Sequence, residues 1–222
     1  MITVTNQIDD PRLLVAVVEV AGGVVREASG QLVAEAEAVS APLLSPAYEL
    51  PEATRKAVRG ALKVGGFSPT GRSKPASEYL LGDLRERGSF NHISGPVDVN
   101  NVVSLETMLP ISLLDGDKVG SAATIRIGAE GEGYIFNPSG QWLDVKRCIV
   151  VCGADGSPLG TPVKDSMAGK VFDACTHFLG VLYGASELYT QQELQVFAQR
   201  MGELLARETG GQILQSGIIE AG

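Results

Sequence analysis

Two adjacent asparagines, Asn100 and Asn101, are the side chains of this sequence best suited to hold a polar ligand. They follow the segment "PVDV" (96–99), which reads as a short strand, and precede residues 102–108, which have helical spacing. A side-chain amide offers hydrogen-bond donors and an acceptor without charge, and asparagine at a strand-to-helix junction also caps the helix. Capping explains one asparagine. The other is available to contact an amino acid or a ribose.

Other residue types that carry chemistry are few. The two histidines are His92 and His177. His177 lies in an apolar segment and is interpreted as a hydrogen-bonded core residue, whereas His92, in "FNHISGP", is open to a structural or a functional role. Cys148 and Cys152 fall on one side of a predicted strand, and without two more ligands they are interpreted as buried core residues. Dinucleotide, phosphate-loop and serine-hydrolase signatures are absent, so we expect no metal and no cofactor.

Basic side chains are concentrated in residues 53–74, a segment that has no Asp or Glu. The whole chain has a formal net charge of −8, which argues against general binding of nucleic acid through a basic surface. A local basic face would suit one anionic partner, and a solvated helix face is the alternative. The side chains concerned are Arg55, Lys56, Arg59, Lys63, Arg72 and Lys74.

Periodicity, together with glycine and proline boundaries, predicts the elements that position these residues. Strands are predicted at 13–20, 122–127, 133–136, 147–152 and 177–183. Helices are predicted at 28–39, 51–64 and 75–87, and from the capping box Thr190–Glu193 to Gly210. The mixture of strands and helices, without repeats, predicts an α+β fold with a mixed β-sheet core packed with helices, and one domain over residues 1–222.

Composition places the chain among globular proteins, since 44% of its residues are hydrophobic and 20% are charged. No apolar run approaches the roughly 18 residues that suggest a membrane span. The N-terminal residues "MITVTNQIDDPR" lack the features of a secretory signal, and three cysteines do not suggest a disulfide framework. We therefore expect a cytoplasmic protein without a membrane partner.

The segment "PVDVNNVVSLETMLPISLLDGDKV" resembles the editing domain in the β subunit of bacterial phenylalanyl-tRNA synthetase, its B-three/B-four tRNA-binding module. The likeness continues through Gly120, Arg126 and the pair Gly131–Glu132. It is strongest over residues 95–132 and extends over about 50–210, where "GFSPTGRSKPASEYLL" is similar to free-standing members of the family. The resemblance implies a mixed sheet with helices packed against it.

The resemblance also assigns site residues. The pocket asparagine of the family falls on Asn101, its neighbouring threonine on Asn100 and its pocket proline on Pro110. A glycine-rich pocket segment falls near Gly160 and Thr161. The histidine and the glutamate that recognise a tyrosine hydroxyl in the synthetase fall on Ser112 and Gly180, so tyrosine specificity is not expected here.

The function that the resemblance implies is hydrolysis, in trans, of the ester of a mischarged aminoacyl-tRNA. Asn101 and Thr161 would be catalytic, with Asn101 binding the developing oxyanion and Thr161 orienting water. Asn100, Pro110, Ser112 and Gly160 would contact the amino acid and the ester. Arg126 would contact the tRNA end or pair with Glu132. The expected partners are tRNA or aminoacyl-tRNA on the basic side chains Arg55, Arg59, Lys63, Arg72 and Lys74, and an amino acid in the pocket.

A non-catalytic module that binds tRNA or a free amino acid is the alternative hypothesis. The acidic net charge suits that alternative, or suits a small ligand better than RNA. The sequence leaves open which amino acid and which tRNA are involved and which oligomeric state the protein adopts.

Overall fold

The computed structural model describes residues 1–222, apart from the side chain of Arg72. Its central sheet is antiparallel throughout and has the strand order β10-β2-β9-β3. The long inner strands carry most of the core, and β3 is an edge strand. The bounds are β2 (Leu13–Ala21), β3 (Ile111–Asp115), β9 (His177–Ala185) and β10 (Gln212–Ile218).

A second four-stranded sheet has the order β1-β4-β7-β8. The pair β1–β4 is parallel, and the other two pairs are antiparallel. A separate hairpin is formed by β5 and β6. The bounds are β1 (Thr3–Asn6), β4 (Ala122–Ile127), β5 (Gly133–Ile135), β6 (Trp142–Asp144), β7 (Ile149–Cys152) and β8 (Pro158–Gly160).

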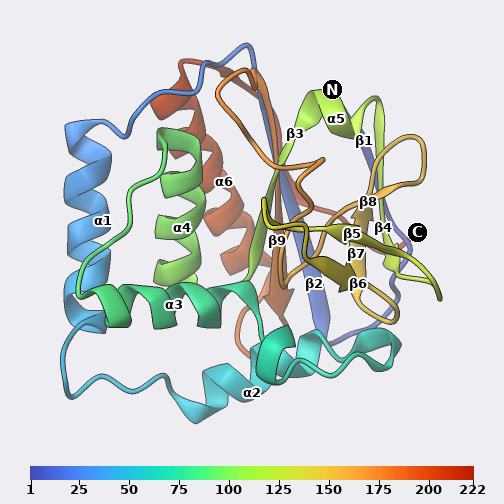
Figure 1. Ribbon diagram of the computed structural model, residues 1–222, viewed down its shortest axis with the longest axis horizontal. Coiled ribbons are helices and arrows are strands. Elements are labelled where there is room, and N and C mark those ends of the chain that lie inside the picture. Colours follow the sequence, from blue (N-terminus) through green and yellow to red (C-terminus); the bar gives the residue numbers. More distant parts are fainter.

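The helices and the second sheet lie on opposite sides of the central sheet (Figure 1). Helices α4 and α6 cover one face, α1 packs on α4, and α2 and α3 run across one end of the molecule. Short helical turns are α5 (Gly116–Val119), Val64–Gly66 and Gly71–Ser73. The longer helices are α1 (Gly30–Leu43), α2 (Glu52–Ala61), α3 (Ala76–Arg87), α4 (Gly95–Thr107) and α6 (Gln191–Thr209).

The layered arrangement explains why β2 reads as a nearly continuous apolar run. Val15 and Val17 face the second sheet, and Ala16 and Val18 face the helices, so both faces of the strand are buried. At roughly 25 cal/mol per Å² of apolar surface removed from water, such doubly covered strands contribute strongly to folding. The exception in the run is Glu19, which is fully buried and hydrogen-bonded.

Most predicted elements are confirmed within one to three residues at either end. Strand 122–127 coincides with β4, and the Thr190–Glu193 capping box begins α6 as expected. His177 is a hydrogen-bonded residue of β9, with its Nε2 2.8 Å from Glu19 Oε1. The cysteines are free and buried. No helix of the described residues is long and apolar enough to cross a bilayer.

The prediction of a strand at 96–99 is wrong. These residues form the first turn of α4, which extends from Gly95 to Thr107 and has Pro96 in its first turn, where a missing N–H costs nothing. The helix is selected because it buries Val99, Val102 and Val103 in the core. The asparagines therefore lie inside a helix and cap nothing. Strands β1, β3, β6, β8 and β10 were not predicted, since most are short and lack clear alternation.

Candidate functional site

The two asparagines point in different directions because successive residues of a helix are about 100° apart. Asn100 shares a helix face with Val97, and both line a cavity. Asn101 lies on the face of Asp98 and is not among the residues that line this cavity. The Asn100 amide donates from Nδ2 to Asn101 Oδ1 at 3.3 Å, and its own Oδ1 is buried without a hydrogen-bond partner among the described residues.

We call this space of about 360 Å³ the asparagine cavity. Its size is within the range of pockets that hold small molecules. One part of the wall is apolar and another part is polar, so the cavity suits a ligand that has both an apolar and a polar group. The apolar lining is Val25, Ile93, Val97, Leu113, Val171 and Phe172, and the polar lining is Ser94, Asn100, Asp165, Lys170 and Asp173.

The loop of residues 161–170 brings Asp165 to the cavity by running along the free edge of β3. The N–H of Asp115 donates to the Gly169 carbonyl at 2.8 Å, and the N–H of Leu113 donates to Asp165 Oδ2 at 3.2 Å. The loop thus satisfies edge groups that no neighbouring strand pairs. Asp165 Oδ1 also accepts hydrogen bonds from Ser112 Oγ at 2.7 Å and from Thr161 N at 3.3 Å.

Burial controls the ionisation of this polar wall. It raises the pKa of Asp165 to about 6, against the hydrogen bonds from Ser112, Leu113 and Thr161 and the charge of Lys170, which favour the carboxylate. Burial also lowers the pKa of Lys170, and the charge of Asp165 opposes this change. The Lys170 ammonium donates to the Phe136 carbonyl at 2.5 Å. At neutral pH Asp165 is therefore mostly a carboxylate, and Lys170 lines the same wall.

Three of the predicted site residues surround Asp165. Ser112 donates its one hydroxyl proton to the carboxylate, so the Tyr183 hydroxyl, 3.0 Å away, donates to Ser112. Thr161 donates its hydroxyl to the Lys164 carbonyl at 2.9 Å and closes its own turn. At Gly160 a Cβ would lie 2.8 Å from Asp165 Oδ1, so only glycine allows the carboxylate this position.

Ser112, Thr161 and Gly160 surround Asp165 without lining the cavity themselves, and the remaining predicted pocket positions also lie outside its lining. Pro110 is buried just before β3, and its carbonyl accepts from Tyr183 N at 3.1 Å. Gly180 is opposite Leu113 in the sheet, and Met201 of α6 occupies the space that a side chain there would need. Arg126 on β4 forms the internal ion pair, with its two terminal nitrogens 2.8 and 2.6 Å from the Glu132 carboxylate.

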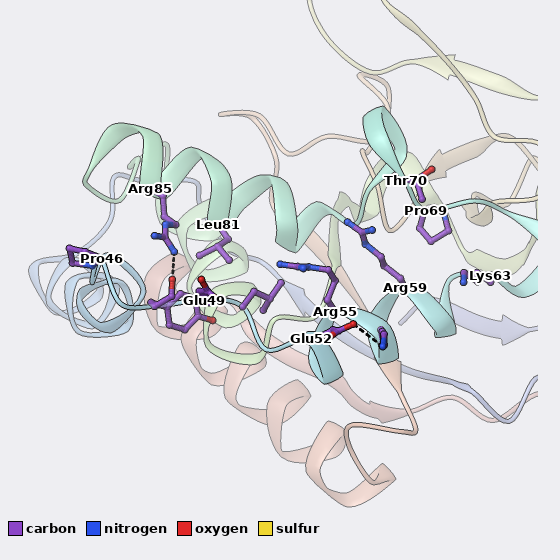
Figure 2. Close-up of a pocket in the computed structure, with 13 residues that line it drawn as sticks. Pro46, Glu49, Glu52, Arg55, Arg59, Lys63, Pro69, Thr70, Leu81 and Arg85 are labelled. Carbon is purple, nitrogen blue, oxygen red and sulfur yellow. Dashed lines mark hydrogen bonds and ion pairs between the residues drawn. The ribbon is translucent and has the colours of Figure 1, made fainter.

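A second feature is a groove of about 1060 Å³ between α2, α3 and the segment before α2, which we call the basic groove. Residues 52, 55, 56, 59 and 63 recur at helical spacing and line it together, so this part of the basic segment forms one face. Figure 2 shows Arg55 and Arg59 extending from α2 into the space beside α3. The charged lining is Glu49, Glu52, Arg55, Lys56, Arg59, Lys63 and Arg85.

Several of these cations already have partners. Arg59 forms a two-pronged ion pair with Glu78, at 2.7 and 2.6 Å, and Lys56 pairs with Glu52 at 2.8 Å. Arg85, which the sequence did not single out, donates to the Tyr48 carbonyl at 2.6 Å. Among the described side chains of the groove, the two basic ones without a hydrogen bond or ion pair are Arg55 and Lys63.

Two further predicted phosphate contacts do not line the groove. Lys74 lies over the Tyr79 ring, 4.6 Å from its centroid. The side chain of Arg72 is outside the described part of the chain. The structure therefore gathers Arg55, Arg59 and Lys63 of the predicted set.

His92 has a structural role that the sequence left open. Its Nδ1 lies 2.7 Å from the buried carboxylate of Asp98, which also accepts from Ile93 N and so orders the chain that enters α4.

Asp165 and Lys170 were missed by sequence reasoning. Both lie in the loop "GTPVKDSMAGK", and an acid between two lysines in a glycine-bounded loop was the available signal.

Comparisons with known proteins support the fold. No protein-family model and no curated protein matches the sequence. Among solved structures, the chain is similar to an N-terminal fragment of the phenylalanyl-tRNA synthetase β subunit from Pyrococcus horikoshii, with a TM-score of 0.50 and 12% sequence identity. The similarity covers 96% of this chain and 50% of that chain. At this identity the likeness shows an α+β fold in common, and this chain spans about half of the fragment's length.

Proposed function

We propose that this protein binds aminoacyl-tRNA and hydrolyses the ester of a mischarged amino acid in trans. The observation that carries the proposal is the asparagine cavity, which Asn100 lines together with Asp165 and Lys170. The side-chain amide of Asn100 suits the α-ammonium group of an aminoacyl ester, because its oxygen can accept a hydrogen bond. The apolar lining suits a hydrophobic side chain. The fold in common with a synthetase β-subunit fragment is consistent with this function.

The chemistry asked of the site is modest because an aminoacyl ester is already reactive. Water adds to the ester carbonyl carbon, the carbonyl oxygen becomes an oxyanion, and collapse of this intermediate releases the amino acid and the ribose hydroxyl. Lys170 is the basic side chain available to stabilise the oxyanion through a hydrogen bond. Asp165 is ionised above about pH 6, can accept a proton from the attacking water and can return it to the leaving ribose oxygen. Asn100 is assigned to substrate orientation.

Asn100→Ala is expected to lower kcat/KM for release of a mischarged amino acid at least tenfold, because the variant loses the amide proposed to orient the aminoacyl group in the cavity. The matched control is Asn101→Ala, the same substitution one residue along α4 and outside the cavity lining. Release is measured from a panel of correctly and incorrectly charged tRNAs. Selective release by the wild type, lost in the Asn100 variant alone, supports the proposal.

Loss in the Asn101 variant alone would instead favour the role that the resemblance gave to Asn101. The second candidate function is a non-catalytic module that binds tRNA or a free amino acid. The paired cations of the basic groove favour a free amino acid over RNA as its ligand. No release from any charged tRNA, with binding of tRNA or of a free amino acid retained, would favour the non-catalytic module.

The basic groove is proposed to contact the tRNA backbone through its unpaired cations. Lys63→Ala is expected to weaken tRNA binding and to reduce the slope of log K against log salt by about 1, because each phosphate contact releases about one counterion. Lys118→Ala removes an exposed lysine from α5, outside the groove, and controls for net charge. Equal slopes for the two variants would contradict a phosphate contact at Lys63.

A further inference from the structure

The β5–β6 hairpin exposes the single tryptophan of the chain. Trp142 is 61% exposed and is directly opposite Ile135, which is 46% exposed. Directly opposed residues of an antiparallel pair lie on one face, so these side chains form an apolar surface open to solvent. The other face, with Tyr134 and Leu143, packs into a cluster with Val145, Cys148, Val150, Cys152 and Val163.

The indole is held in place by the hairpin. A Cβ at Gly133 would lie 2.6 Å from Cε2 and Cζ2 of Trp142, so the ring rests against the glycine backbone. At the tip, Asn137 Nδ2 donates to Gln141 Oε1 at 2.8 Å, and Gln141 N donates to Asn137 Oδ1 at 3.0 Å. The ring is therefore a supported platform whose exposed part is available to a stacking partner.

Hydrogen bonds join this platform to the wall of the asparagine cavity. The N–H of Met167 donates to the Ile135 carbonyl at 2.8 Å, and the Lys170 ammonium donates to the neighbouring Phe136 carbonyl. Lys170 lines the cavity, and Met167 lies between Asp165 and Lys170 in the same loop. The hairpin is thus attached to the loop that supplies Asp165 and Lys170 to the cavity proposed for the aminoacyl group.

We propose that Trp142 stacks on the 3′-terminal adenine of the bound aminoacyl-tRNA. This inference rests on the proposed function, because the amino acid of such a substrate is esterified to the terminal ribose and brings the terminal base with it. Unpaired bases stack on exposed aromatic side chains whatever the rest of the sequence. The apolar character of the Trp142–Ile135 surface suits the face of a base.

The charge beside the platform favours the terminal nucleoside over an internal nucleotide. Asp144 lies two residues from Trp142 on the same strand face and carries a negative charge. It would repel a phosphate, but it can accept a hydrogen bond from the adenine amino group or a ribose hydroxyl. The terminal nucleoside has no phosphate on its 3′ side, so it is the part of tRNA that tolerates this carboxylate best.

The test uses the intrinsic fluorescence of Trp142 in the full chain and uncharged RNA minihelices. One minihelix ends in CCA, and the other is identical but lacks the terminal adenosine. We expect saturable quenching by the first, and binding about tenfold weaker for the second. Anisotropy of the labelled minihelix should give about tenfold weaker binding for Trp142→Ala and little change for Trp142→Phe. Val196→Ala, which trims another exposed apolar side chain, on α6, should bind as the wild type does.

Equal affinity for the two minihelices, unchanged binding by Trp142→Ala, or no RNA binding at all would overturn the inference. Quenching that depends on protein concentration without RNA would show that a second copy covers the platform, and would also overturn it. The minihelices carry no amino acid, so they test base stacking separately from ester hydrolysis. If binding depends on the terminal adenosine but no aminoacyl-tRNA is hydrolysed, the stacking role of Trp142 stands and the deacylase function does not. If hydrolysis depends on Asn100 but not on Trp142, the deacylase function stands and the stacking role of Trp142 does not.

Discussion

Replacing Glu19 with alanine is expected to lower the free energy of unfolding by about 3 to 5 kcal/mol, the cost of breaking a buried charged network. Glu19 is fully buried on β2 and accepts hydrogen bonds from Ile2 N, at 2.9 and 3.0 Å, and from Gln215 Nε2, at 2.5 Å. His177 Nε2 lies 2.8 Å away. Without the carboxylate these groups remain buried without their acceptor, and β1 and β10 lose a common attachment to β2.

The effect is measured by urea unfolding of the two proteins, with Glu187→Ala as the control for loss of an exposed glutamate. That control should change stability by less than about 0.5 kcal/mol. A loss below about 1 kcal/mol for Glu19→Ala would show that the network contributes little.

Acid should weaken this network in the wild type. Burial acts to raise the pKa of Glu19, but hydrogen bonds from Gln215, Ile2 and His177 outweigh it, so the pKa is below the ordinary value of 4.5. The folded state then binds fewer protons than the unfolded state. The stabilisation is present above about pH 4.5 and is lost as the pH falls through the lower folded pKa, and Glu19→Ala should lack that loss.

Asp165→Asn should show the opposite dependence on pH. The folded pKa of Asp165, about 6, is above its ordinary value of 3.8, so the folded state binds more protons between these values. Stability contributed by the protonated acid is present at low pH and is lost as the pH rises to about 6. The difference in unfolding free energy, variant minus wild type, should therefore rise by about 2 kcal/mol from pH 4.5 to 7.5.

The comparison of variant with wild type at each pH cancels the titration of the other carboxyl groups. An asparagine at 165 still offers one acceptor for Ser112 and Thr161, so the fold should persist in the variant. Asp173→Asn, at another position in the cavity lining, is the matched control. A difference that is flat with pH would mean that the Asp165 carboxyl titrates near its ordinary pKa.

Local patterns were sufficient for elements whose two faces are unambiguous. Alternation in "AATIRI" gives β4, and the hydrogen bonds of the Thr190–Glu193 box specify where α6 begins, whatever surrounds them. The same is true of His177, whose apolar neighbours predicted a satisfied core residue. The segment at 96–99 is different, because two valines and a proline fit either a strand or the first turn of a helix, and only burial of Val99, Val102 and Val103 against the sheet selects the helix.

The sequence by itself therefore determined the α+β composition, most of the strands and helices, the buried cysteines and the two candidate regions of chemistry, around the asparagines and at residues 53–74. These properties depend on neighbours along the chain. Tertiary structure decided that Asn100, and not Asn101, reaches the cavity, because helix phase sets the direction of each side chain. It also decided that Asp165 meets Ser112, 53 positions away, because the edge of β3 needed partners for its backbone and the 161–170 loop supplied them. Such contacts join residues that are far apart in the sequence, so local sequence patterns do not predict them.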